Sequence, residues 1–245
     1  QSDNQAARAS QTALATRGVP LKLRNAPKTA GVSSAELALL PRLPDTKVEI
    51  EEIGKTLQAD PSQDIFLQRD ANVSRVMEMD LSNRRVVMFA THGLVPGELD
   101  GLMQPALALS APDVTGETKG DGLLTMEQIL TLNLNADWVV LSACNTASGE
   151  GAGSEAVSGL GRAFFFAGAR ALLVSNWPVD SEASRMLMTD LFQRQQAQQG
   201  AHKAVYLRDA MMQMMQNVGS RDPQGRIKYS YAHPLFWAPF VVVGD

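Results

Sequence analysis

Short apolar runs alternate with longer amphipathic segments along most of this chain, and polar residues, glycine or proline bound each run. Apolar runs rich in β-branched residues are typical of strands that are buried on both faces. On this pattern we predict four principal strands, at residues 85–91, 138–143, 170–175 and 240–243. Two shorter strands are predicted at residues 64–67 and 106–109.

The segments between these runs favour helices. We predict them at residues 72–79, 125–132, 155–167, 180–199 and 203–218, together with one that begins at Pro44. Asp45 and Thr46 supply N-cap chemistry for that first helix. Its apolar face is predicted from Val48, Ile50, Ile53 and Leu57. Strands that alternate with helices in this way indicate an α/β layered fold.

Two segments depart from the regular pattern. Residues 1–39, whose first part is rich in Gln, Ala, Ser and Asn, are assigned to an N-terminal flank, and residues 40–245 to the main domain. Residues 93–122 hold many glycines and prolines. We therefore predict a long functional or mobile loop there, with the short strand at residues 106–109 inside it.

Composition narrows the class of protein. The 245 residues suit one domain with a flank, and a hydrophobic fraction of 44% and a charged fraction of 20% are average for soluble globular proteins. The net charge of −4 gives no support for nucleic-acid binding. No apolar stretch reaches the roughly 18 residues that a membrane-spanning helix needs, so no membrane contact is predicted.

One thiol and one imidazole are the reactive groups that stand out. Cys144, the one cysteine of the sequence, follows the apolar run 138–143, and His92 follows the run 85–91. In open parallel sheets, ligand sites form at the carboxyl ends of strands. A thiol is only slightly ionised near neutral pH, but a neighbouring imidazole can accept its proton. The two residues therefore predict a Cys-His nucleophile pair.

Each of these residues alone has a simpler interpretation. A single cysteine is often a small buried hydrophobe, and a histidine at a strand end is often structural. Both residues lie at matching strand ends and precede loops that contain glycine, which favours the catalytic interpretation. His92 also precedes Cys144 by about 50 residues, the spacing that caspases have between histidine and cysteine. The caspase pentapeptide itself is absent.

Around these residues the sequence resembles the CHAT domain family, a group of bacterial relatives of caspases and separase in one clan of cysteine peptidases. The resemblance covers about residues 40 to 245. Its motifs, in chain order, are Leu43-Pro44-Asp45-Thr46 with Glu49 and Glu52, Phe89-Ala90-Thr91-His92-Gly93, Asp121-Gly122-Leu123-Leu124-Thr125, Leu141-Ser142-Ala143-Cys144-Asn145-Thr146, Leu160-Gly161-Arg162-Ala163-Phe164, Trp177-Pro178-Val179-Asp180 and His233-Pro234-Leu235-Phe236-Trp237-Ala238.

The resemblance implies a caspase-like three-layer sandwich in which helices flank a mostly parallel central sheet. It implies a cysteine endopeptidase in which Cys144 is the nucleophile and His92 accepts the thiol proton and later protonates the leaving amine. The backbone N–H groups of Gly93 and Cys144 are then the oxyanion hole. No orienting carboxylate for His92 can be assigned, although Asp100 and Asp137 are available.

By the same resemblance, the segment after the strand 170–175 helps to build the substrate pocket. Its candidate residues are Asn176, Trp177 and Asp180, and for Asp180 we favour the simpler role of capping the helix that follows. No cofactor is implied. No metal site is predicted either, since three histidines and one cysteine lack metal-ligand spacing.

The resemblance further implies a protein substrate and an upstream or partner region, such as tetratricopeptide repeats, that recruits partners and regulates the peptidase. Relatives have another strand just before residue 1, so we expect this sequence to begin inside the domain. One cysteine suits a reducing compartment, and we predict a cytoplasmic location. A periplasmic or secreted enzyme with a single catalytic thiol would have the same cysteine content. The alternative function is a non-catalytic interaction module, and a thiol-dependent acyl transferase or hydrolase of other substrates is a third.

Overall fold

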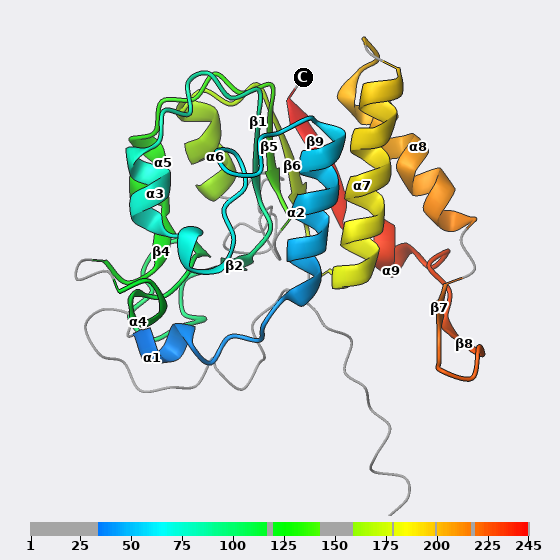
Figure 1. Ribbon diagram of the computed structural model, residues 1–245, viewed down its shortest axis with the longest axis horizontal. Helices are drawn as coiled ribbons and strands as arrows, with labels where there is room; N and C mark the ends of the chain where they lie inside the picture. Colours follow the sequence, from blue (N-terminus) through cyan, green and yellow to red (C-terminus); the bar gives the residue numbers. More distant parts are fainter. Residues whose placement is uncertain are drawn as a thin grey trace, which may run out of the picture.

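A mostly parallel sheet forms the centre of the molecule, with the strand order β1-β5-β6-β9 (Figure 1). β1, β5 and β6 run parallel, and β9 pairs with β6 in the antiparallel sense. The computed structural model describes residues 34–116, 120–142, 159–177, 179–198, 200–216 and 219–244. Within them the central strands are β1 (Val86–Phe89), β5 (Trp138–Leu141), β6 (Ala171–Ser175) and β9 (Phe240–Gly244), which confirms the four principal strands predicted.

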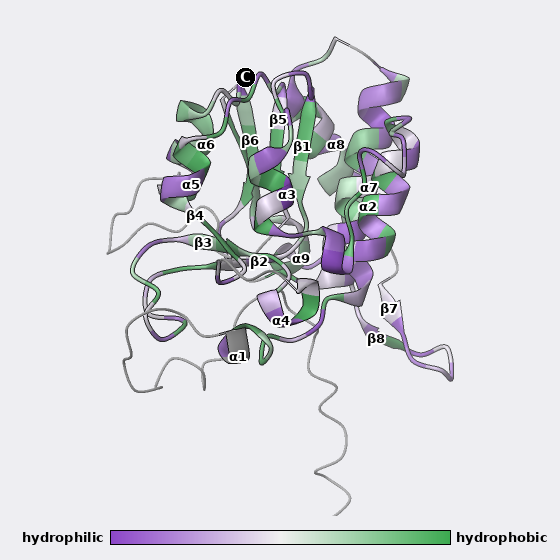
Figure 2. Ribbon diagram, turned by 60° about the vertical axis from the view of Figure 1, so that its left-hand side comes forward, coloured by the Kyte–Doolittle hydropathy of each residue, from purple (hydrophilic) through white to green (hydrophobic). Residues whose placement is uncertain are grey.

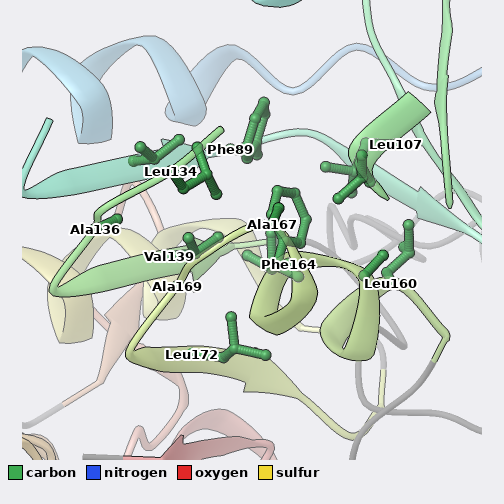
Figure 3. Close-up of a cluster of buried hydrophobic side chains, with 14 of the residues drawn as sticks. Phe89, Leu107, Leu134, Ala136, Val139, Leu160, Phe164, Ala167, Ala169 and Leu172 are labelled. Atoms are coloured by element: carbon green, nitrogen blue, oxygen red, sulfur yellow. The ribbon is translucent and has the colours of Figure 1, made fainter. Parts of the chain in front are cut away.

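One face of the sheet packs against three short helices. Phe89, Leu141 and Leu172 lie in a buried cluster on this face, and Phe164 lies against Phe89 with its ring centroid 5.6 Å away (Figure 3). Because successive side chains of a strand point to opposite faces, alternate positions of each strand belong to this cluster. The helices on this face are α3 (Val73–Glu78), α5 (Met126–Leu130) and α6 (Gly159–Phe166).

The opposite face of the sheet has its own core. Trp138, Val140 and Leu173 belong to this second cluster, and Trp138 packs on Phe192 with ring centroids 6.2 Å apart. The helices that cover this face are α2 (Pro44–Thr56), α7 (Ser181–Ala197), α8 (Lys203–Met215) and α9 (Pro234–Trp237). Figure 2 shows that the central strands are largely hydrophobic, whereas the helices beside them include many hydrophilic residues. Helices on both faces of a mostly parallel sheet confirm the predicted α/β fold and are compatible with a caspase-like sandwich.

A second sheet, which we did not predict, lies beyond the carboxyl end of β1. It is antiparallel, with the order β2-β3-β4, and its strands lie within or at the ends of the segment that we had predicted to be a long loop. The strand predicted at residues 106–109 is confirmed as β3. The strands are β2 (His92–Leu94), β3 (Ala106–Ala108) and β4 (Leu123–Thr125), and the nearby short helices are α1 (Ser34–Leu37) and α4 (Pro112–Thr115).

Burial explains why this second sheet forms despite the many turn-forming residues near its strands. One side of the second sheet forms a third apolar cluster with α1, in which Leu94, Leu123 and Leu37 are buried. Leu107 and Leu124 point the other way, into the cluster around Phe164, and Figure 3 shows Leu107 near Leu160 of α6. The second sheet is therefore attached to the central sheet through a shared core.

The predicted helices are largely confirmed. Two local predictions need correction, one at a helix and one at a strand. The first helix begins at Pro44 as predicted, but Leu43 occupies the N-cap position, and Asp45 and Thr46 lie in the first turn. Proline suits the first helical position because it lacks an N–H and has a fixed φ. The predicted strand at residues 64–67 is wrong, because Ile65 packs closely on Gly54 of α2 and takes no part in a sheet.

The rest of the described chain adds peripheral elements. A short hairpin of β7 (Ser220–Arg221) and β8 (Ile227–Tyr229) extends beside α9, and a 3-10 helix at Gln68–Asp70 precedes α3 (Figure 1). Positions 155–158, 199, 217 and 218 of the predicted helices, and position 143 of a predicted strand, lie outside the described residues. None of the described helices combines the length and the apolar character that a membrane span requires.

Asp137 ties together the amino ends of the three parallel strands. Arg85 Nε donates a hydrogen bond to its Oδ2 at 2.8 Å, and Arg170 Nη1 donates to its Oδ1 at 2.7 Å. The hydrogen bond from Arg85 is the main cause that lowers the pKa of Asp137 below its ordinary value, partial burial opposes it, and the charges of Arg85 and Arg170 lower the pKa further.

We expect Asp137→Asn to lower the free energy of unfolding at pH 7 by about 0.5–1 kcal/mol, because each solvent-accessible ion pair contributes only about 0.2–1 kcal/mol. The pKa of Asp137 is lower in the folded than in the unfolded state. Its stabilisation is therefore present above the unfolded pKa of about 3.9 and is lost as the pH falls through the folded value. Urea unfolding measured at pH 7 and at about pH 3 checks this. An equal difference between wild type and variant at both pH values would contradict the ion-pair origin.

Candidate active site

β1 delivers His92 to the edge of the central sheet. The strand ends at Phe89, and after Ala90 and Thr91 the chain enters β2, of which His92 is the first residue. The Thr91 hydroxyl donates a hydrogen bond to the carbonyl of Ala108 in β3, which holds this corner. The backbone of His92 is therefore fixed by both sheets.

The register of the second sheet determines which way the imidazole faces. His92 pairs with Ala108 and Leu94 pairs with Ala106, so these residues share one face of the sheet. Leu94, Ala106 and Ala108 line the third apolar cluster, together with Leu37 from α1. His92 is only 5% exposed, so the N-terminal segment that contains α1 covers its side chain.

A backbone carbonyl in that segment holds the imidazole. His92 Nε2 lies 2.7 Å from Pro41 O, just before the start of α2. A carbonyl oxygen can only accept a hydrogen bond, so Nε2 carries the proton, and Nδ1 is the basic nitrogen of the neutral ring. We had looked for an orienting side-chain carboxylate, and Asp137 is excluded from that role because it lies at the opposite ends of the strands. No sequence signal marks a main-chain acceptor.

The register of the central sheet brings the two candidate segments to neighbouring points. Phe89 of β1 lies opposite Leu141 of β5, and the two candidate residues follow these strand ends at the same distance along the chain. Adjacent strands lie about 4.8 Å apart. Cys144 itself lies outside the described residues, so the distance between its thiol and His92 stays a prediction.

Ser142, the last described residue before Cys144, is fully buried and hydrogen-bonded. Its hydroxyl donates to Glu49 Oε1 at 2.7 Å, and Glu49 is also fully buried. The periodicity of the first helix had assigned Val48 to the buried face, but Val48 is 42% exposed and Glu49 points inward. The available signal was the four-residue spacing of Glu49 and Ile53, which places both on one side of α2.

Gly93 is part of the second sheet. Gly93 is buried in the middle of β2 and pairs with Leu107. The Leu107 side chain lies on the face of the second sheet that is opposite to His92 and the third apolar cluster. Because glycine has no side chain, a substrate can approach the Gly93 backbone closely. Its part in an oxyanion hole, with the N–H of Cys144, stays a prediction.

The predicted pocket residues follow β6, the strand beside β5. Asn176 is tied to the C-terminal segment, since its backbone N–H and its Nδ2 both donate to Pro239 O, at 2.9 and 3.2 Å. The Trp177 side chain is 36% exposed, and its Nε1 lies 3.5 Å from Leu235 O. Both residues therefore lie at the same sheet edge as His92, but whether they bind a substrate stays a prediction.

Asp180 caps α7, as we had predicted. Its Oδ1 accepts a hydrogen bond from the backbone N–H of Ala183 at 2.9 Å, and its side chain is largely buried. Burial raises the pKa of Asp180 above its ordinary value, and the negative charges of Glu182 and Asp45 raise it further. A role for Asp180 in substrate binding is untested.

Comparison with known protein families identifies the type of domain. The family model described as "CHAT domain" matches residues 1–245. The chain belongs to the CHAT domain family. CHAT domains fall within a caspase-like peptidase clan, which agrees with the fold and with the candidate residues at the ends of β1 and β5. The match spans the whole sequence, and the division between residues 39 and 40 stays a prediction.

A curated relative is similar to part of this CHAT domain. It is the Tetratricopeptide repeat protein 28 of Mus musculus, which is 30% identical over 123 residues. That stretch covers 50% of this chain and 4% of the relative, so the chain spans a small fraction of the relative's length.

We expect Asp180→Asn to leave the free energy of unfolding at pH 7 unchanged or slightly raised, whereas Asp180→Ala lowers it by about 1 kcal/mol through loss of the cap. Asparagine keeps the capping oxygen and removes a charge that burial disfavours. Because the pKa of Asp180 is raised in the folded protein, the advantage of asparagine is largest above that pKa and disappears in acid. Urea unfolding at pH 7 and at about pH 3 tests this, and equal losses in both variants would show that the charge itself is needed.

Proposed function

We propose that this CHAT domain is a cysteine endopeptidase that cleaves partner proteins, with Cys144 as nucleophile and His92 as general base. The observation that carries the proposal is the placement of His92. Its buried imidazole is held through Nε2 by the carbonyl of Pro41, at the end of the strand next to the one that leads to Cys144. A basic Nδ1 at this edge is what a neighbouring thiol requires.

The tautomer of His92 assigns the proton transfers. Nδ1 accepts the proton of the Cys144 thiol, and the thiolate attacks the carbonyl carbon of the peptide bond. The imidazolium then donates that proton from Nδ1 to the leaving amine, and a thioester on Cys144 remains. Water, deprotonated by Nδ1, hydrolyses the thioester and releases the acid product. The Pro41 carbonyl accepts from Nε2–H throughout and stabilises the charged ring.

Backbone and pocket groups complete the proposal. The N–H groups of Gly93 and Cys144 stabilise the oxyanion, and fixed donors of this kind cost no reorganisation during the reaction. Trp177 supplies one wall of the substrate pocket, which its partial exposure at the sheet edge permits. Asn176 positions that wall through its two hydrogen bonds to Pro239 O, and Asp180 holds the start of α7 behind it.

The partner and the cellular setting belong to the same proposal. We infer an upstream or partner region with tetratricopeptide-like repeats, which would regulate cleavage and bring in the substrate. The similarity to a protein whose name includes tetratricopeptide repeats supports this inference. We also propose a cytoplasmic location and a bacterial origin, on the basis of the single cysteine and of the family resemblance.

We expect Cys144→Ala and His92→Ala each to lower kcat/KM by about 10³-fold or more, because nucleophile and base act as one unit. The whole chain is incubated as the enzyme with a denatured proteome digest, and mass spectrometry measures how fast the peptides are cleaved. His202→Ala is the matched control, since His202 lies exposed at the N-cap position of α8. Cleavage that is unchanged in Cys144→Ala would refute the proposed nucleophile.

Thiol ionisation gives a second test that needs no substrate. Because the sequence has one cysteine, iodoacetamide reports on Cys144 alone. A dyad lowers the thiol pKa below its ordinary value of about 8.5, so the alkylation rate should reach half its maximum well below that pH. His92→Ala should move the midpoint back toward about 8.5. An ordinary profile in both proteins would instead support the non-catalytic interaction module.

A further inference from the structure

The pair of Glu49 and Ser142 is unusual for its position in the core. All four residues of β5 are apolar and fully buried, and Ser142, which follows the strand directly, is buried just as deeply but is polar. Its partner is a carboxylate that reaches it from α2. A polar pair therefore stands at the carboxyl end of an otherwise apolar strand, two residues before Cys144.

Stability does not explain the pair well. Moving a carboxylate out of water carries a large free-energy cost, and hydrogen bonds offset it only in part. Buried charged groups can often be replaced by apolar residues of similar volume without loss of stability. A buried glutamate–serine contact at this point of the chain therefore suggests a role beyond holding the helix to the sheet.

The same N-terminal segment also contacts the other half of the proposed dyad. Pro41, just before α2, holds the imidazole of His92, and Glu49, in the second turn of α2, holds Ser142. α2 is itself anchored to the next helix of its layer, because Glu52 accepts hydrogen bonds from Arg185 Nη1 at 3.2 Å and Thr189 Oγ1 at 3.0 Å of α7. One anchored segment thus contacts the residues that lead to both reactive groups.

We propose that Glu49 is a positioning residue for the nucleophile, acting through Ser142. The carboxylate fixes the Ser142 hydroxyl and with it the direction in which the chain leaves β5 toward Cys144. Because Pro41 orients His92 from the same segment, α2 and the residues before it set the relative placement of thiol and imidazole. This inference rests on the proposed function of Cys144 and His92.

Substitutions can separate positioning from packing. Ser142→Ala removes one oxygen atom, and Glu49→Leu combined with Ser142→Ala replaces the pair by apolar side chains of similar volume. Glu49→Gln keeps an acceptor for the Ser142 hydroxyl and removes the charge. Glu51→Gln is the matched control, because Glu51 lies on the same helix with half of its side chain exposed to solvent.

The readouts are the kcat and KM for a peptide cleaved by the wild-type chain, the pH profile of iodoacetamide alkylation at Cys144, and thermal melting of the whole chain. We expect Ser142→Ala and the double variant to lower kcat at least about tenfold, with KM within about twofold, and to move the alkylation midpoint toward about 8.5. Glu49→Gln should stay within about threefold of wild type, and Glu51→Gln should match wild type. If the double variant fails to melt cooperatively, the result for Ser142→Ala alone tests the positioning role.

Unchanged kcat and an unchanged alkylation profile in Ser142→Ala and the double variant would overturn the positioning role. If Cys144→Ala still abolished cleavage in that case, the proposed peptidase activity would remain supported, but without a positioning role for Glu49. Undiminished cleavage by Cys144→Ala would instead overturn the peptidase, and the alkylation profiles would still show whether the pair governs the environment of the thiol. A loss of kcat in Glu51→Gln as large as that in Ser142→Ala would also count against the proposal.

Discussion

Parallel pairing between β1 and β5 is the constraint on which the candidate site depends. The register places Phe89 opposite Leu141, so the chain leaves both strands at one edge of the sheet. The pairing is strongly specified because both faces of the sheet are buried, and a slip by one residue would exchange the side chains of the two cores. Phe89 packing on Phe164 and Trp138 packing on Phe192 oppose such a slip from either side.

The second sheet fixes the position of the His92 imidazole at this edge of the central sheet. Since only two residues separate the end of β1 from the start of β2, His92 has little freedom to move relative to the central sheet. Leu107 and Leu124 join the second sheet to the main core, and the opposite side of that sheet packs beneath α1. The imidazole is thus buried between the second sheet and the N-terminal segment that contains α1, and such packing helps to maintain the geometry of a site.

The general fold could be predicted from sequence because buried strands carry a strong pattern. The runs ending at residues 91, 143, 175 and 243 are apolar enough to mark the central sheet, and the capping residues Thr125 and Asp180 mark the starts of α5 and α7. Apart from β3, the second sheet escaped prediction because its strands span three residues each, too few to show a period. Its stability comes from contacts between distant segments, such as Leu37 with the cluster around Leu94.

The candidate site, like the fold, could be predicted from sequence only in part. His92 and Cys144 could be selected from sequence, because reactive side chains at strand ends are rare and their chemistry can be inferred from the residue type. The partners of the site could not, because they depend on tertiary contact. The predicted apolar face of the first helix did not include Glu49, whose carboxylate points inward, and the Pro41 contact involves a main-chain atom that every residue possesses.

That main-chain contact has a consequence for how this protein could be dissected. The acceptor that orients His92 has no side chain to remove, so alanine scanning across residues 34–43 would pass over it. Its influence depends on where the backbone runs, and it would be sensitive to inserted or deleted residues between α1 and α2 that shift the carbonyl. The length of this connection, more than its composition, is therefore the property that a change of sequence must preserve.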